Sequence, residues 1–329
     1  MAQHPWVAEM AEGPPRFGVQ LVLPEDGLAR LPETARFVES LGFDALFIFD
    51  HPALHPDPWV CLTAAAVATK RIRLGSAVNC VPYRHPTHLA RLAADLDQLS
   101  HGRLLLGLGA GWLEPEFRAL DVPFLAAPER LAALSEAIEI IQGVWGPEKF
   151  SYAGTYFRTE AMRVTPPPVQ QPRPAFIIGG GGERLTLRLV ARHGDACNIN
   201  ELALVEGKQE RVGGTDTIRH KLAVLRDHCA DAGRSPDEVL RTHFTIRLVL
   251  AASESALIDK LARQSAAPSA SPGTRRAGAT AALTGTPVQI LTYYQEMAAA
   301  GLQYFVVQLA ADDVETLELL ATEIMPRLA

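Results

Sequence analysis

The sequence predicts a (β/α)8 barrel, the TIM-barrel fold, in which eight parallel strands alternate with helices. About eight short apolar segments alternate along the chain with segments whose apolar residues recur at helical spacing. A glycine closes a predicted helix shortly before the next strand at Gly42, Gly194 and Gly301. A doubly wound open sheet would show the same alternation. However, no Gly-x-Gly-x-x-Gly follows the first strand, where such a sheet would bind a dinucleotide.

The predicted strands are short and apolar, as expected for strands that are buried on both faces. Seven lie at residues 17–23, 45–49, 72–78, 175–178, 196–199, 243–250 and 304–309, and one lies within the stretch 103–112. Between them, apolar residues recur every three or four positions, as Leu89, Leu92, Leu96 and Leu99 do, which predicts helices. The predicted helices lie near residues 31–41, 58–70, 86–99, 131–143, 218–229, 288–297 and 314–328, with two more after Gly182 and after Ser253.

The domain organisation is predicted to be simple. Residues 1–15 are expected to form a loose leader, and residues 16–329 a single barrel domain. The alternation breaks at residues 145–174, where aromatics and prolines indicate an insertion with short strands. Residues 265–285 are rich in alanine, serine, proline, glycine and arginine and are expected to be flexible.

Composition excludes several classes of protein. The formal net charge of the 329 residues is −6, which does not suggest a nucleic-acid or membrane partner. The four cysteines are scattered without a Cys-x-x-Cys motif, as in reduced cytosolic proteins. The first residues lack the basic and apolar regions of a signal peptide, and no apolar run approaches the ~20 residues of a membrane span. The sequence therefore predicts a cytoplasmic protein.

The central element is the stretch from Arg103 to Trp112, which reads as a buried strand that runs into a glycine-rich loop. Because glycine has no Cβ, Gly107, Gly109 and Gly111 would let the end of this strand lie against something flat. The alternative is a tight turn between a strand and a helix.

The carboxyl ends of barrel strands carry the active site, so the predicted strand ends predict its wall. These ends contain Asp50 and His51, Ala77, Val78 and Asn79, Ala110, Gly111 and Trp112, Gly179, Gly180, Gly181 and Gly182, and Asn198, Ile199 and Asn200. Such a wall offers much backbone and few charges, which suits a flat, largely apolar ligand with an anionic tail. The run of four consecutive glycines opens a predicted helix, and the exposed N–H groups at a helix start can bind phosphate. A flexible turn is the alternative for this run.

His51 is the predicted catalytic residue, because an imidazole can exchange a proton near neutral pH. Asp50 would orient His51 or bind the ligand, and the alternative for both is a proline-rich loop. His55 and Asp57 would complete a metal cluster with these two residues. Prolines at 52, 56 and 58 preclude a regular helix there, so no metal is predicted.

Several segments in order resemble one family. They are Phe49-Asp50-His51, Asp57-Pro58-Trp59, Arg71-Ile72-Arg73-Leu74-Gly75, Pro82-Tyr83-Arg84-His85-Pro86, Leu99-Ser100-His101-Gly102-Arg103-Leu104, the Gly107 to Trp112 loop, Ile178 to Arg184, and Gly285-Thr286-Pro287. Together they resemble the luciferase-like monooxygenase superfamily, in its branch of oxidoreductases that depend on the deazaflavin coenzyme F420. The resemblance extends from about Phe17 to Leu309.

The resemblance implies a (β/α)8 barrel that binds coenzyme F420 at its carboxyl face and transfers a hydride between the deazaflavin C5 and a small organic substrate. It places Asp50 and His51 at the cofactor ring, and a backbone bulge at Ala77 and Val78, often with a non-proline cis peptide, behind the ring. The loop with Ala110, Gly111 and Trp112 and the run of Gly179, Gly180, Gly181 and Gly182 would hold the cofactor side chain and phosphate. Trp112 stands where some sugar-phosphate-oxidising relatives have glutamate, which argues against a sugar phosphate. Members of the family are often homodimers, so a homodimer is expected.

Two alternatives remain open at the level of sequence. One is an FMN-dependent monooxygenase of the same superfamily, which uses reduced flavin and O2. The Gly-Ala-Gly-Trp loop and the four glycines favour the deazaflavin branch. The other is a non-catalytic flavin-binding protein on the same barrel, which the presence of Asp50 and His51 disfavours.

Overall fold

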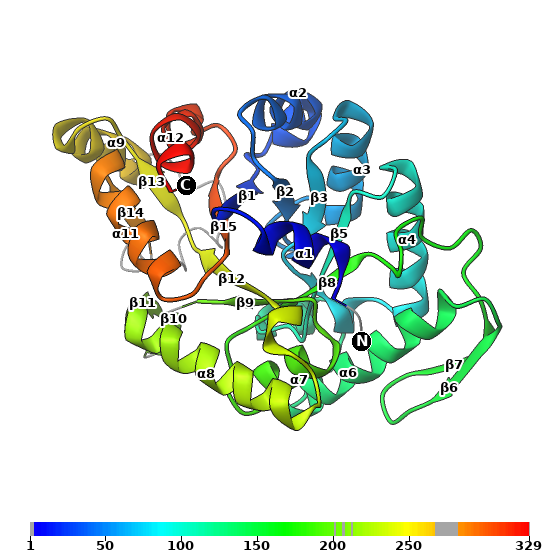
Figure 1. Cartoon of the computed structure of the whole chain (residues 1–329). Helices are drawn as coiled ribbons and strands as arrows, with labels where there is room; N and C mark the ends of the chain where they lie inside the picture. Colours follow the sequence, from blue (N-terminus) through cyan, green and yellow to red (C-terminus); the bar gives the residue numbers. More distant parts are fainter. Residues whose placement is uncertain (1–2, 201, 206–207, 212, 267–281, 329) are drawn as a thin grey trace.

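Eight parallel strands close into a barrel that is surrounded by helices (Figure 1). The computed structural model describes residues 3–200, 202–205, 208–211, 213–266 and 282–328. Around the barrel the strands follow the order β3, β2, β1, β15, β12, β9, β8 and β5, and pairing of β3 with β5 closes the ring. The predicted (β/α)8 barrel is confirmed.

The strands of the wall are four to seven residues long and nearly all of their residues are buried. They are β1 (Arg16–Val22), β2 (Ala45–Ile48), β3 (Arg73–Ser76), β5 (Leu104–Gly109), β8 (Ala175–Gly179), β9 (Ala196–Ile199), β12 (Leu240–Thr245) and β15 (Tyr304–Ala310), with the short β4 (Asn79–Cys80) beside β5. The strand predicted at residues 243–250 is wrong in its second half. There, β13 (Leu248–Leu250) leaves the wall and pairs with β14 (Leu283–Gly285).

The helices agree with the predicted apolar periodicity. They are α2 (Gly27–Ser40), α3 (Pro58–Ala68), α4 (Pro86–Leu99), α6 (Ala127–Val144), α7 (Thr186–His193), α8 (Thr215–Asp231), α9 (Glu254–Ala266), α11 (Pro287–Ala299) and α12 (Val314–Leu319), and the last continues as a π turn and a 3₁₀ turn to Arg327. A capping residue followed by proline starts several of them; Asp57, for example, accepts N–H bonds from Trp59 and Val60 at the start of α3. Among the described residues, none of the helices combines the length and the apolar character that crossing a lipid bilayer requires.

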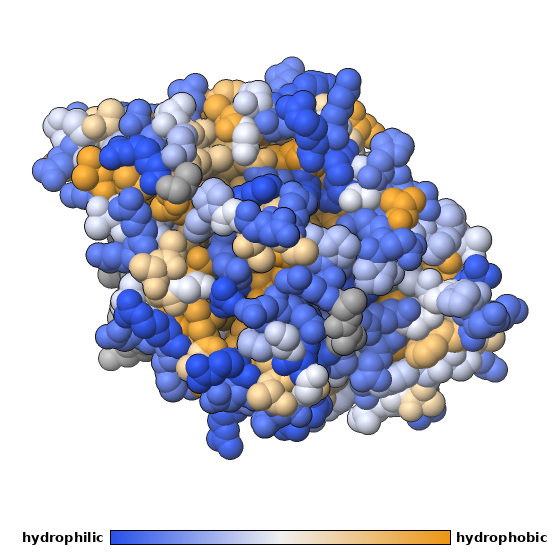
Figure 2. Space-filling view, viewed as in Figure 1, coloured by the Kyte–Doolittle hydropathy of each residue, from blue (hydrophilic) through white to orange (hydrophobic). Residues whose placement is uncertain are grey.

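The expected loose leader is wrong, because α1 (Pro5–Ala11) packs across the amino end of the barrel. Trp6, Val7 and Met10 are buried in the interior cluster of the barrel, and the Trp6 ring meets Tyr304 edge-on with the ring centroids 5.7 Å apart. On the polar side of α1, Glu9 forms an ion pair with Arg16 at 3.1 Å. Figure 2 shows this closed end, where hydrophilic side chains predominate around α1. The candidate site is therefore expected at the opposite, carboxyl end.

The predicted insertion at residues 145–174 is present, and its short strands form the hairpin β6 (Phe150–Ala153) and β7 (Arg158–Met162), which projects beside α6 in Figure 1. Glu136 of α6 holds the turn of this hairpin, since its carboxylate accepts N–H bonds from Thr155, Tyr156 and Phe157 at 2.8–3.0 Å. The segment predicted to be flexible at 265–285 lies mostly outside the described residues. Its end is ordered, however, because residues 283–285 form β14.

A second carboxylate joins α2 to the link between α3 and β3. Glu39 accepts the backbone N–H groups of Lys70, Arg71 and Ile72 at 2.9, 2.6 and 3.0 Å. Although partial burial acts to raise the pKa of Glu39, these three donors bring the pKa below its ordinary value of 4.5. A carboxyl group with a lowered pKa stabilises the folded state above its unfolded pKa, and this contribution is lost as the pH falls through the folded pKa.

Glu39→Gln is therefore expected to lower the free energy of unfolding by about 1 kcal/mol at neutral pH, a value reduced for the exposure of the group. Urea unfolding measures this loss, which should shrink as the pH falls below 4.5. The control is Glu33→Gln, because Glu33 is exposed on the same helix. Equal stabilities of the two variants at neutral pH would contradict the assignment.

Candidate active site

A backbone bulge follows β3 at the carboxyl end of the barrel. The peptide bond between Ala77 and Val78 is cis, as the family resemblance implied. Gln20 of β1 donates a hydrogen bond to the Ala77 carbonyl oxygen, and Gln308 of β15 donates to Gln20 Oε1 at 2.7 Å. On the other side, Ser76 Oγ accepts the Gly107 N–H at 3.1 Å. Polar side chains of three strands thus hold the bulge in place.

The glycines of β5 make room for this bulge. A Cβ on Gly107 would overlap the Ser76 carbonyl oxygen, and one on Gly109 would lie 2.5 Å from Val78 Cγ2. On the neighbouring strand β8, a Cβ on Gly179 would lie 2.9 Å from Val78 Cγ1. The expectation that Gly107 and Gly109 face a flat ligand directly is therefore wrong. They receive the bulge, and the bulge is the element that a ligand can meet.

His51 follows β2 and pairs with a carboxylate that the sequence did not single out. Its Nδ1 lies 2.6 Å from Oε2 of Glu116 in the short helix α5 (Glu114–Ala119). The same oxygen accepts the Tyr83 hydroxyl at 3.1 Å, and Oε1 accepts the Ala53 N–H at 3.3 Å. The Glu116 side chain is 2% exposed and the His51 ring 21%. Because Nδ1 is held by Glu116, Nε2 is the nitrogen that His51 can offer to a ligand.

Two aromatic rings flank His51. The Phe49 and Trp112 ring centroids lie 5.6 and 5.8 Å from that of His51. Trp112 belongs to the glycine loop after β5 and is 49% exposed. Within the same loop, Gly111 has φ +77° and packs against Phe117 and Cys80, which a side chain would displace. The predicted residues Ala110, Gly111 and Trp112 therefore lie at the carboxyl end, with Trp112 beside His51.

Of the two roles predicted for Asp50, the orientation of His51 is wrong, because the described hydrogen bonds of Asp50 go to other residues, whereas the binding of a ligand stays a prediction. Its buried carboxylate forms an ion pair with Arg84, with Nη1 at 2.5 Å from Oδ2, and accepts the Cys80 N–H at 3.1 Å. Arg84 also contacts Asp57 at 2.8 Å. Asp50 thereby ties the end of β2 to the segment after β4, which makes it a positioning residue.

His55 has a structural role. Its buried Nε2 accepts the Leu23 N–H and its Nδ1 lies 3.1 Å from the Pro56 carbonyl oxygen. Burial lowers the pKa of His55, so the neutral ring joins the loops after β1 and β2. In the described part of the chain no three histidine, cysteine, aspartate or glutamate side chains form a metal-binding group.

The glycine run follows β8, which lies three places from β2 in the closed order of strands, by way of β5 and β3. In the closed order of strands, β9 lies four places from β2 in either direction, and Gly179 pairs with Asn198 of β9. Gly180 has φ +119°, which a side chain would strain. Helix α7 begins at Thr186, so three residues separate it from Gly182, contrary to the prediction that the run opens the helix directly.

A lysine from α8 completes this side. Lys221 Nζ donates to the Asn200 carbonyl oxygen at 3.2 Å, and a Cβ on Gly181 would lie 2.7 Å from the same Nζ. An ammonium group beside a stretch of bare backbone is a suitable donor set for an anion. Sequence reasoning found the glycines but missed Lys221, which is one of several basic residues on an amphipathic helix.

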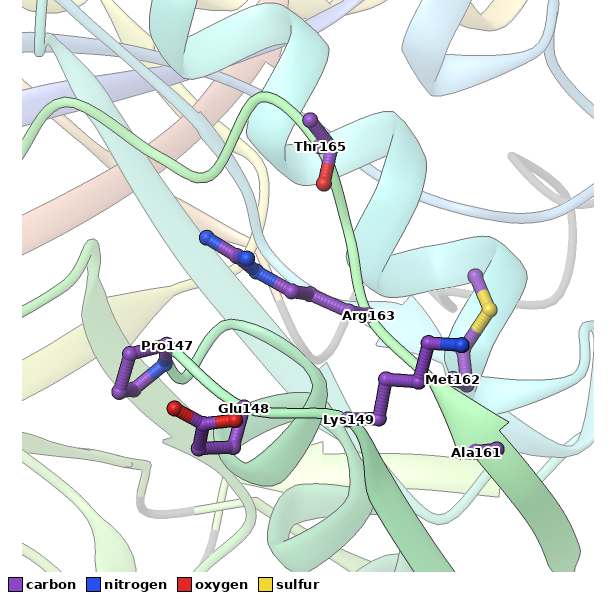
Figure 3. Close-up of a pocket in the computed structure, with 7 residues that line it drawn as sticks. All are labelled: Pro147, Glu148, Lys149, Ala161, Met162, Arg163 and Thr165. Atoms are coloured by element: carbon purple, nitrogen blue, oxygen red, sulfur yellow. The ribbon is translucent and has the colours of Figure 1, made fainter.

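One hollow on the surface lies elsewhere. It has a volume of about 650 Å³ and lies between the end of α6 and the base of the β6–β7 hairpin. Its lining residues are Pro147, Glu148, Lys149, Ala161, Met162, Arg163 and Thr165 (Figure 3). None of these residues contributes to the carboxyl end of the barrel, so the hollow is separate from the candidate site.

Comparisons with known proteins agree with this architecture. The sequence profile of the luciferase-like monooxygenase family matches residues 13–311. The chain is 32% identical over 240 residues to an F420-dependent glucose-6-phosphate dehydrogenase of Nakamurella multipartita, a match that covers 70% of this chain and 66% of that enzyme. It is 31% identical over 189 residues to an FMNH(2)-dependent dimethylsulfone monooxygenase of Pseudomonas putida, covering 57% of this chain and 50% of that enzyme. The chain thus spans between a half and two thirds of these two curated relatives.

Among solved structures, the coenzyme F420 dependent tetrahydromethanopterin reductase of Methanopyrus kandleri superposes with a TM-score of 0.78. The superposition covers 96% of this chain and all of that one, at 21% identity. A likeness at this level of identity supports the fold.

Proposed function

Because the chain belongs to the luciferase-like monooxygenase family, a family of oxidoreductases, we propose that it is an F420-dependent oxidoreductase that acts on a small organic substrate. The observation that carries the proposal is the placement of three features at one end of the barrel. These are the supported bulge at Ala77 and Val78, the glycine run with Lys221, and the pair of His51 and Glu116. The similarity to F420-dependent enzymes at about 32% identity supports the choice of cofactor.

The residues present fit a flat cofactor with an anionic tail. The bulge at Ala77 and Val78 would support the ring, and Ala110, Gly111 and Trp112 would adjoin it. Gly179, Gly180, Gly181 and Gly182 with Lys221 would hold the phosphate, since glycine backbone without side chains lets an anion approach closely and an ammonium group attracts it. The Gly180 N–H already donates to the Asn198 carbonyl oxygen at 3.2 Å, so Gly181 and Gly182 would supply the N–H contacts. When bound, the deazaflavin supplies hydride transfer at its C5.

The protein supplies the proton that accompanies a hydride when a carbonyl and an alcohol interconvert. His51 Nε2 holds or accepts this proton, because Glu116 occupies Nδ1. Glu116 is a positioning residue that fixes the ring orientation and stabilises the imidazolium when it forms, and the Tyr83 hydroxyl in turn fixes Glu116. Asp50 and Arg84 hold the loop that carries His51.

Parallel fluorescence titrations with F420 and FMN test the cofactor, and F420 should bind more tightly. FMN binding at least as tightly would favour the second candidate, an FMN-dependent monooxygenase, which the similarity to the FMNH(2)-dependent enzyme supports. The homodimer and the cytoplasmic location remain predictions.

The phosphate site is tested in the same titrations. Lys221→Met should weaken F420 binding by about tenfold, the effect of about 1.4 kcal/mol for a lost charge-assisted contact. It should leave the binding of the deazaflavin without its phosphate tail unchanged. Arg219→Met is the matched control, because Arg219 is an exposed cation on the same helix. Equal losses for both deazaflavins would remove Lys221 from the phosphate site.

A further inference from the structure

Lys221 and His51 lie on opposite sides of the carboxyl end of the barrel. Lys221 contacts the Asn200 carbonyl oxygen just after β9, which lies four places from β2 in the closed order of strands, and His51 follows β2. Among the described residues, the ion pairs on the His51 side join the carboxylates of Glu116, Asp50 and Asp57 to His51 and the guanidinium of Arg84. Three carboxylates in these pairs therefore share one permanent cation. An anionic substrate group brought to His51 would meet net repulsion.

The guanidinium groups of Arg84 and Arg130 near His51 already bind other groups of the protein. Arg84 is occupied by Asp50 and Asp57, which together accept three hydrogen bonds from its guanidinium. Arg130 of α6 donates to the carbonyl oxygen of Gly111 at 3.3 Å and so supports the glycine loop. Neither guanidinium is therefore placed to receive an anionic substrate group at His51.

The surfaces next to His51 are aromatic. Phe49 and Trp112 flank its ring, and the edge-on contact of Trp112 leaves about half of the indole exposed. Exposed large aromatic side chains at a site offer stacking area to an apolar ring at a small cost in side-chain entropy.

From the charge distribution and the aromatic surface we propose that the substrate is an uncharged, apolar ring compound with a carbonyl or alcohol group, which stacks on Trp112 with its oxygen toward His51. A sugar phosphate or a carboxylate is disfavoured. This inference deepens the proposed function and rests on it for the identity of the reacting group, but the preference for an uncharged ring concerns binding and can be measured without turnover.

Acetophenone and 4-acetylbenzoate form a matched pair of probes, because they differ only in a carboxylate. Calorimetric titration of the full-length protein, with and without bound oxidised F420, gives the dissociation constant of each, and glucose 6-phosphate serves as a third probe. Acetophenone is expected to bind at least tenfold more tightly than either anion. Equal or tighter binding of 4-acetylbenzoate or glucose 6-phosphate, or no binding of acetophenone up to its solubility, would overturn the inference.

Two variants test whether Trp112 and Glu116 cause the preference for an uncharged ring. Trp112→Ala should weaken acetophenone binding about five- to tenfold, whereas Leu120→Ala, which removes a comparably exposed apolar side chain at the end of α5, should not. Glu116→Gln removes one negative charge, so it should reduce the discrimination against 4-acetylbenzoate several-fold. An effect of Trp112→Ala no larger than that of Leu120→Ala would contradict the stacking role.

The proposed function and the proposed substrate class fail separately. If F420 does not bind but the unloaded protein still prefers acetophenone, the proposed function fails and the preference for an uncharged ring stands. If F420 binds and the two probes bind equally, the proposed function stands and the substrate class is wrong.

Discussion

Replacing His51 with asparagine is expected to lower the turnover number by about 10²–10⁴-fold, the usual effect of a lost general acid or base. The dissociation constant of F420 should change by less than about tenfold, because asparagine still fills part of the space and the bulge, Lys221 and the glycine run are untouched. Steady-state kinetics with any carbonyl or alcohol substrate, together with a fluorescence titration of the cofactor, give the two constants separately.

The control is His88→Asn, which changes an exposed histidine on α4 and should alter neither constant. If His51 only packs against the cofactor, affinity falls and the rate at saturating cofactor is retained. A rate of the His51→Asn variant that equals that of the native protein at every pH would remove His51 from the mechanism.

Glu116→Gln separates positioning from proton transfer. The glutamine side chain keeps a hydrogen bond to Nδ1 of His51 but cannot stabilise a charged imidazole, so a smaller loss of turnover than for His51→Asn is expected. The loss should appear in kcat, with a smaller change in KM, because the glutamine still holds the ring of His51 in place. A variant that is merely destabilised would lose activity only in proportion to its unfolded fraction, which urea unfolding measures separately.

Gly107→Ala is expected to destabilise the barrel by about 3 kcal/mol or more. The added Cβ would overlap the Ser76 carbonyl oxygen and lie 2.8 Å from the Ser76 carbonyl carbon. These are backbone atoms of the strand that leads into the bulge, so they cannot rotate away as a side chain can. If the variant folds, the bulge must move, and the affinity for F420 should fall as well.

Urea unfolding and the cofactor titration measure both effects. Gly13→Ala is the matched control, because a Cβ on Gly13 would have no atom within 4 Å. Native stability together with native F420 affinity in Gly107→Ala would show that the bulge does not require this glycine. A stable variant with weakened cofactor binding would still support the bulge as the ring support.

The architecture could be predicted because buried strands and helices have a recognisable local pattern of apolar residues. Each barrel strand is short and apolar, and each outer helix carries an apolar stripe, so the alternation is visible without knowledge of any long-range contact. This pattern of apolar residues is weaker in terminal and irregular segments. Helix α1 is only seven residues long, and the burial of its Trp6, Val7 and Met10 becomes clear only when the helix is placed against the amino end of the barrel.

The site was predicted in outline for the same reason. In a barrel all carboxyl ends of the strands meet at one end, so the ends at His51, Ala77, Val78 and the glycine run could be brought together from their order alone. The roles within that outline were less predictable. The glycines of β5 were expected to face a ligand, and the structure shows that they accommodate the bulge.

Local patterns in the chain were enough to predict the barrel and to place His51 at its carboxyl end, where the candidate site is proposed. The partners of these groups became visible only in the folded molecule. Glu116 lies 65 residues from His51, and Lys221 reaches the glycine run from a helix 40 residues beyond Gly181. The burial of a residue can be predicted from the apolar pattern of its neighbours in the sequence. Whether Asp50 or Glu116 contacts His51 depends instead on the direction in which each side chain projects from the closed barrel.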